Sequence, residues 1–155
     1  MCLKTNKIAI IKMLMATFAM FIFMQTGWSQ GIVGKWKTID DETGEPKSIV
    51  QIWKAEDGFY YGKIMKLFDE TKKDNVCDKC DPKDPRYNQK VVGMKILMKM
   101  KKTGDNEYGE GTILDPNNGK VYKCKLYREG ANLMVRGFIG VSLIGRTQTW
   151  LPSAE

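Results

Sequence analysis

The stretch KVYKCKLYREGANLMVRGFIGVSLIGRTQTWL, residues 120–151, decides the fold class of this 155-residue chain. Its apolar and polar residues alternate over three runs, 120–129, 132–140 and 142–151, which is the pattern of half-buried β-strands. Glycine and asparagine stand at the ends of the runs, where short turns require them. Because short connectors force neighbouring strands to run antiparallel, this stretch predicts consecutive antiparallel strands joined by hairpins.

The same pattern extends toward the N-terminus. We expect five further strands at residues 34–40, 47–55, 59–68, 90–102 and 110–115, and no helix. Eight consecutive strands, each with one solvated face, are best accommodated by a closed barrel, because closure removes exposed sheet edges. The prediction is an all-β chain with a single antiparallel up-and-down β-barrel of about eight strands.

Alternation is clearest in the run 90–102. We expect its apolar face to point inward and its lysines to face solvent; the apolar face comprises Val92, Met94, Ile96, Met98 and Met100. With 155 residues and 43% hydrophobic content, the chain can bury one proper core, and nothing in it suggests a second domain.

The N-terminal residues have the order of a secretory signal peptide. Three lysines lead into an almost wholly apolar run at 13–24, which is followed by the small residues Gly27 and Ser29. We therefore expect a signal peptide at 1–29, cleavage between Ser29 and Gln30, and a barrel domain at 30–155. The exported domain would be periplasmic or secreted, with no stable membrane span. A retained anchor is the alternative, although the apolar run is shorter than the about 20 residues of a spanning helix.

Net charge argues against nucleic acid as a partner. The whole chain carries +7, but residues 1–29 contribute three lysines and no acidic residue, so the remainder carries +4. Most of its lysines alternate with apolar residues along strands, as in KILMKMKK, which is typical of a solvated sheet face. We expect no nucleic-acid partner.

The long charged segment 69–89 contains the pair Cys77 and Cys80. A loop of this length inside a compact domain is usually functional or held by a crosslink. A local disulfide is favoured, because an exported protein meets an oxidising compartment. A zinc site and a redox-active pair are the alternatives; zinc would have to recruit Cys124 or nearby carboxylates. Cys124 itself has the place of a buried, reduced small side chain.

Catalytic constellations are scarce. The chain has no histidine, so it lacks any Ser-His-Asp or Cys-His pair. The acidic run Asp40-Asp41-Glu42 precedes Thr43-Gly44 and is better explained as a hairpin turn. We therefore expect no catalytic residue, no metal site and no cofactor, and we do not expect an enzyme.

Gly34-Lys35-Trp36 at the start of the first strand, together with an arginine late in the last strand, resembles the lipocalin and calycin arrangement. The resemblance implies that Gly34 and Trp36 close the base of the barrel and that an arginine packs across the indole. A buried guanidinium is tolerable there because it stacks on the ring. Arg146 is the expected partner of Trp36, with Arg136 as the alternative.

A second resemblance covers residues 33–150. It rests on GKWKTIDDETGEPKSIVQI, YYGKI, CDKC, VVGMKIL, GTILDPNNGKVYKCKL and VRGFIGVSLIGRTQTW, which occur in the order of domain-of-unknown-function family 2147. The chain is identified as a member of this family of small exported bacterial proteins. The resemblance implies a calycin-like barrel in the cell envelope, and it implies no activity.

The function expected from the sequence is binding of a small apolar or anionic ligand in the barrel or at its mouth. Its candidate ligand contacts are Arg136, Lys63, Tyr122, Met94 and Met98. An eight-stranded barrel is barely wide enough for its own side chains or one small ligand. The alternative function is an envelope interaction or stress-related module without a small ligand. It would use the charged cysteine segment or the basic strand faces to contact another protein or an anionic surface.

Overall fold

The structure, a computed structural model, describes residues 31–155; the predicted signal peptide lies outside the described residues. A short 3-10 turn, η1 (Glu70–Lys72), accompanies eight strands. The strands are β1 (Gly34–Ile39), β2 (Pro46–Lys54), β3 (Tyr60–Leu67), β4 (Lys95–Lys102), β5 (Glu107–Asp115), β6 (Lys120–Glu129), β7 (Asn132–Phe138) and β8 (Gly145–Ser153).

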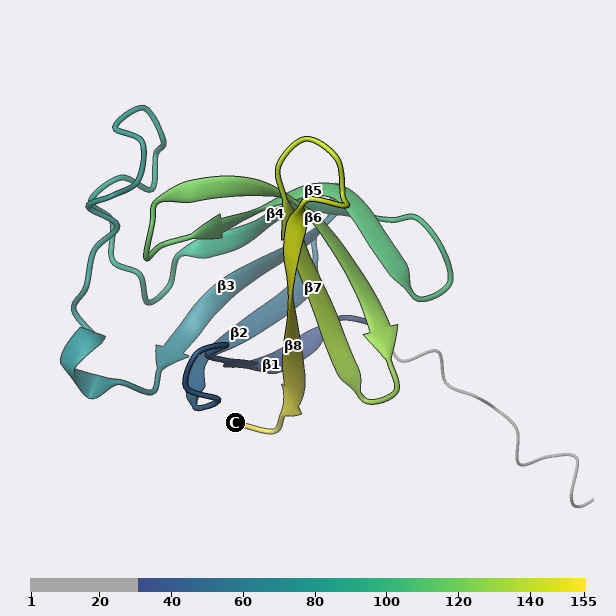
Figure 1. Cartoon of the computed structure of the whole chain (residues 1–155), viewed down its shortest axis with the longest axis horizontal. Coiled ribbons are helices and arrows are strands. Elements are labelled where there is room, and N and C mark those ends of the chain that lie inside the picture. The colour runs from purple at the N-terminus through teal and green to yellow at the C-terminus, as the bar shows by residue number, and fades with distance from the viewer. Residues whose placement is uncertain (1–30) are drawn as a thin grey trace, which may run out of the picture. The chain divides into compact units, whose positions relative to one another are not determined.

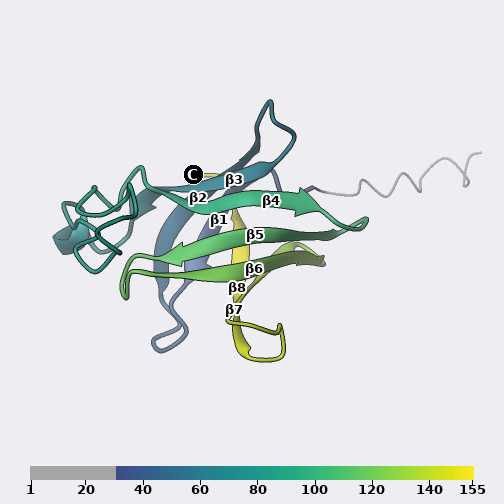
Figure 2. The same ribbon diagram turned by 90° about the horizontal axis from the view of Figure 1, so that it is seen from above.

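All eight strands form one closed antiparallel barrel in chain order (Figure 1). β8 returns to β1 and closes the sheet with a register that runs from Lys35 opposite Ser153 to Thr38 opposite Trp150. Figure 2 shows β3 to β6 side by side along one wall. The all-β up-and-down barrel predicted from the sequence is confirmed. Because every strand and the closing pair lie within residues 31–155, this part of the chain is a compact unit with a core of its own.

We call the end where β1 begins the base and the end where β8 begins the mouth. Inward-facing side chains fill the barrel between them, and eight large ones are nearly inaccessible to solvent: Trp36, Ile52, Leu97, Met100, Tyr108, Leu126, Leu133 and Trp150. Their burial supplies the hydrophobic stabilisation of the fold. No helix among the described residues is long and apolar enough to cross a bilayer.

The predicted strand 90–102 is shorter in the structure, and its predicted inward face is wrong. β4 begins at Lys95, so Val92 and Met94 precede it. Leu97 lies opposite Gly62 on the inward face, which turns Ile96 and Met98 outward. A bulge at Lys99, with a φ of 51°, then brings Met100 inward. One extra residue reverses the alternation of side chains, so the apolar pattern alone assigned Met98 to the wrong face.

Residues 68–94 connect β3 to β4 at the mouth, and we call them the cysteine connection. The segment folds back on itself: Val76 bridges Lys90, and the amide of Cys77 donates to the carbonyl of Gln89. Its buried residues Cys77, Cys80, Val91 and Met94 belong to the same apolar cluster as Leu114 of β5. A segment that is highly charged in sequence therefore has a small apolar centre that covers the outside of the barrel wall.

Candidate functional site

Trp36 is buried at the base of the barrel, and the guanidinium over its ring belongs to Arg128. The Arg128 guanidinium lies 4.8 Å from the centre of the Trp36 ring. The indole Nε1 donates to the carbonyl of Ile32 at 2.8 Å. Arg128 is on β6, and its cross-strand partner Leu133 is inward-facing, so the geometry brings the guanidinium over the ring from inside the barrel.

The prediction that Arg146 stacks on Trp36 is wrong. Trp36 pairs with Pro152, which lies six residues beyond Arg146 along β8, or about 20 Å at the rise of a strand. Arg146 stands at the mouth, where its Nη2 lies 2.6 Å from Oδ2 of Asp41. Register therefore separates the two residues.

Asp41 and Arg146 belong to a chain of polar contacts that starts in the core. Trp150 Nε1 donates to Gln148 Oε1 at 3.3 Å, and Gln148 Nε2 donates to Asp41 Oδ2 at 3.0 Å. The Asp41 carboxylate neutralises the charge of Arg146 in this ion pair, and it also accepts a hydrogen bond from Gln148. It joins β8 to the turn between β1 and β2, and it offers no unpaired charge to a ligand.

The predicted ligand contacts do not come together. Arg136 is on the outer surface, where it holds the loop between β7 and β8. Lys63 also faces outward, with its Nζ 6.0 Å from the centre of the Trp53 ring. Tyr122 faces inward at the mouth and accepts a hydrogen bond from Asn118 at 3.0 Å. Met94 is the last residue of the cysteine connection and is buried in the apolar centre of that segment.

The two cysteines of the connection form a disulfide, which confirms the favoured sequence prediction. Both are buried, at 0% and 3% exposure, and the Sγ of Cys77 lies 3.9 Å from the carbonyl oxygen of Pro116. This burial is typical of a structural crosslink. Cys124 is free and buried inside the barrel, as predicted, and burial raises the pKa of its thiol to about 12. Among residues 31–155, no group of three or more metal-ligating side chains is arranged around one point.

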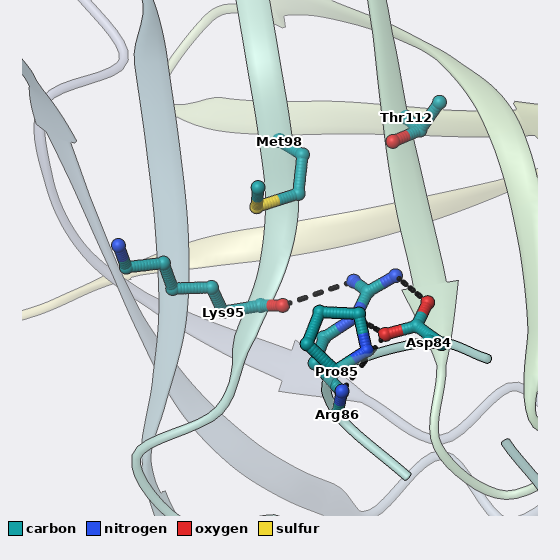
Figure 3. Close-up of a pocket in the computed structure, with 6 residues that line it drawn as sticks. All are labelled: Asp84, Pro85, Arg86, Lys95, Met98 and Thr112. Atoms are coloured by element: carbon teal, nitrogen blue, oxygen red, sulfur yellow. Dashed lines mark hydrogen bonds and ion pairs between the residues drawn. The ribbon is translucent and has the colours of Figure 1, made fainter. Parts of the chain in front are cut away.

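A pocket of about 390 Å³ lies between the cysteine connection and the outer wall of the barrel (Figure 3). Its lining residues are Asp84, Pro85 and Arg86 from the connection, Lys95 and Met98 from β4, and Thr112 from β5. Met98 and Thr112 are direct cross-strand partners, so they form one continuous floor. Met98, predicted to face the interior, thus lines this pocket on the outer wall.

The Arg86 side chain is held in place at this pocket by three hydrogen bonds. Its Nε and Nη2 donate to the two carboxylate oxygens of Asp84 at 2.8 and 2.6 Å, and its Nη1 donates to the carbonyl of Lys95 at 3.1 Å. The Arg86 guanidinium lowers the pKa of Asp84 below its usual value, so the pair stays ionised and neutral overall. Figure 3 shows the Lys95 side chain pointing away from the pair, and its Nζ lies 5.9 Å from the centre of the Tyr61 ring.

Sequence reasoning missed Asp84, Arg86 and Thr112. The signal available was the tripeptide Asp84-Pro85-Arg86, in which a rigid proline separates a carboxylate from a guanidinium. Asp84 lies within the charged segment 69–89, where nothing local distinguishes it from the other acidic residues. Its meeting with β4 and β5 depends on how the connection folds back, which no local pattern encodes.

Comparison with known proteins agrees with this architecture. A solved structure described as "Protein HP1028 from the human pathogen Helicobacter pylori belongs to the lipocalin family" is similar to this chain, with a TM-score of 0.69 and 19% sequence identity. The similarity covers 79% of this chain and 83% of that protein, and at this identity it concerns the fold. No match was found among curated proteins.

The sequence also matches a family across the whole barrel. Residues 34–151 fit the family described as "Uncharacterized protein conserved in bacteria (DUF2147)". The matched range begins with β1 and ends within β8, so it contains both the base and the pocket. The chain therefore belongs to the bacterial family DUF2147, and it has a lipocalin-like barrel.

Proposed function

We propose that this protein is an exported binding module that takes a small, neutral, amphipathic molecule in the pocket beside Arg86. The Cys77–Cys80 disulfide supports export, because disulfides persist in oxidising compartments. The signal-peptide pattern at residues 1–29 supports it too, although it lies outside the described residues. The lipocalin-like barrel is compatible with binding a small molecule.

The observation that carries the proposal is the prearranged Asp84–Arg86 pair at the rim of an apolar floor. Pro85, Met98 and the Thr112 methyl group offer a surface for an apolar group. The guanidinium has five N–H donors, of which three are engaged, so two remain for an acceptor on the ligand. Because the pair is neutral overall, it favours an uncharged polar group over an anion.

The proposal puts the ligand on the outer wall near the mouth rather than inside the barrel. The interior already holds Trp36, Leu97, Met100 and Trp150, all nearly inaccessible to solvent. A pocket of about 390 Å³ is within the range that small-molecule sites have, roughly 300–1,000 Å³. The filled interior and the volume of the outer pocket both favour a binding site on the outer wall.

Calorimetric titration of the chain with a panel of neutral amphipathic molecules tests the proposal. Thr112→Phe should fill the floor of the pocket and abolish binding of any hit without unfolding the barrel. Lys123→Phe is the matched control, since Lys123 is the exposed cross-strand neighbour of Thr112 but does not line the pocket. Binding that survives Thr112→Phe, or a panel without any hit, would contradict the proposal.

The second candidate is contact with another protein through the cysteine connection. The observation in its favour is the exposed run of alternating charge at Asp78, Lys79 and Asp81, which the buried disulfide holds in a fixed shape. Asp78→Lys with Asp81→Lys would then abolish the partner's binding but leave the small-molecule titrations unchanged. The two candidates therefore predict different sensitive residues within one segment.

A further inference from the structure

Residues 139–144, which we call the aliphatic loop, join β7 to β8 and expose four aliphatic side chains. The exposed fractions are 63% for Ile139, 60% for Val141, 89% for Leu143 and 71% for Ile144. Figures 1 and 2 show the loop projecting away from the barrel wall. Single exposed aliphatic residues are ordinary on protein surfaces. Four such residues within a six-residue loop form an apolar patch, and exposed apolar patches commonly mark interaction sites.

The loop is held in this shape from behind. Arg136 donates through Nε to the carbonyl of Ser142 at 2.8 Å and through Nη2 to the carbonyl of Leu143 at 3.3 Å. Its Nη1 donates to Oγ1 of Thr147 at 2.9 Å. These hydrogen bonds from the guanidinium hold two backbone carbonyls of the loop, while the four aliphatic side chains stay exposed.

Four consecutive carbonyls of the loop have partners within the protein. Val141 accepts from the amide of Ile144, and Ile144 accepts from the amide of Ile139. Ser142 and Leu143 accept from Arg136. An unpaired carbonyl transferred to an apolar medium costs several kcal/mol, so satisfying these four acceptors in advance lowers the cost of moving this part of the loop out of water.

Exposed lysines flank the loop on one side. Lys123 lies opposite Phe138 and Lys125 lies opposite Arg136, both on the outer face of β6, and neither forms an ion pair with a residue in the described range 31–155. On the other side, the turn between β1 and β2 carries acidic residues. Its Asp40 is paired with Lys47 and its Asp41 with Arg146, so within residues 31–155 Glu42 and Glu45 are the acids of that turn without an ion pair.

We propose that the aliphatic loop inserts into the interfacial region of an anionic lipid bilayer, with Lys123 and Lys125 at the headgroups. An aliphatic tip with internally paired carbonyls suits hydrocarbon, and neighbouring lysines are attracted to anionic headgroups. A protein groove would be a poorer match, because the loop has few free backbone acceptors to offer a partner. This inference goes beyond the proposed small-molecule binding and does not depend on it.

Vesicle flotation tests the inference on residues 31–155, which contain the complete barrel. This chain should float with phosphatidylcholine vesicles that contain phosphatidylglycerol. Leu143→Ser with Ile144→Ser should reduce the bound fraction by a factor of ten or more, since each side chain loses roughly tenfold in partitioning. Val33→Ser is the matched control: Val33 is 57% exposed but stands at the base, and its replacement should leave flotation unchanged.

A second pair of variants separates the electrostatic contribution. Lys123→Gln with Lys125→Gln should weaken flotation by several-fold per lysine on the anionic vesicles and have little effect on phosphatidylcholine alone. Absence of flotation for the unaltered chain would overturn the proposal. So would equal flotation of Leu143→Ser with Ile144→Ser, or a dimer in sedimentation that this double variant dissociates, because the loop would then bind a second copy.

Discussion

The cysteine connection and the aliphatic loop both emerge at the mouth, and they treat their apolar residues in opposite ways. The connection is long and highly charged, yet it buries Cys77, Cys80 and Met94. The loop is short and mostly aliphatic, yet it exposes Leu143 and Ile144. Length explains the difference: a long segment can fold back and form its own apolar centre, whereas a six-residue hairpin has no room to cover its side chains. Hydropathy alone therefore does not predict burial in these connections.

The largest expected effect is at Gly119, where the turn between β5 and β6 meets the cysteine connection. An added Cβ would collide with the backbone of Lys79, and Gly119 also has a φ of +71°. We expect Gly119→Ala to lower the free energy of unfolding by about 3–4 kcal/mol, from left-handed strain and overpacking together. Urea denaturation measures this loss.

Gly58→Ala is the control for that experiment. Gly58 has a φ of +83° and no atom within 4 Å of an added Cβ, so only the backbone strain, about 1–2 kcal/mol, should appear. Equal losses at both glycines would mean that the connection is not docked on the turn.

Next in size is the disulfide. Cys77→Ala with Cys80→Ala should cost about 2 kcal/mol, because the crosslink closes only a short loop and restricts the unfolded chain modestly. The connection should also become the first site of limited proteolysis, while the barrel stays intact. A variant with unchanged stability and unchanged cleavage would show that the apolar packing alone holds this segment.

Arg136→Ala should release the aliphatic loop at a cost of about 1–2 kcal/mol, since three hydrogen bonds to a partly solvated cation are lost. Amide hydrogen exchange should rise at residues 139–144 and stay unchanged in the cysteine connection. Arg136→Lys should rescue little, because an ammonium cannot reproduce the planar fork. Continued protection of the loop in Arg136→Ala would be the contrary result.

A smaller, pH-dependent effect should distinguish the two segments. Arg86 lowers the pKa of Asp84 from its usual 3.8, so the pair stabilises the fold above that pH and the contribution is lost as acid protonates the carboxylate. As the pH is lowered below about 4, the urea concentration at the denaturation midpoint should therefore fall more steeply for the unaltered chain than for Asp84→Asn. The aliphatic loop has no ionisable group, so Leu143→Ser should keep the steeper dependence. Identical pH profiles for the unaltered chain and Asp84→Asn would count against the pair.

The smallest effect is expected at Leu143 itself. Leu143→Ser should change the free energy of unfolding by less than about 0.5 kcal/mol, because the side chain is 89% exposed. Leu114→Ala, at a buried leucine under the cysteine connection, should cost about 2–4 kcal/mol by comparison. Thermal and chemical denaturation of both variants checks the contrast; a large loss at Leu143 would mean that the loop packs on the barrel.

Local chemistry explains why so much of the barrel was predictable. The strand of residues 120–129 was placed without error, because alternation and turn residues are properties of short stretches. The Cys77–Cys80 disulfide was the favoured of three alternatives, because the predicted export signal implies an oxidising compartment. The pocket could not be predicted from the sequence, because Arg86 and Thr112 come together only when the cysteine connection has folded onto the barrel wall.

By itself, the sequence determined the all-β class, the eight strands and their antiparallel order, and it favoured the local crosslink. Tertiary structure alone decided that Arg128 rather than Arg146 covers Trp36, that Met98 faces outward, and that the aliphatic loop stays exposed. The physical reason is register: closing β8 onto β1 and inserting a bulge at Lys99 set which residues share a face and an end. Residues far apart in the chain become neighbours through that closure, and a local pattern contains no information about it.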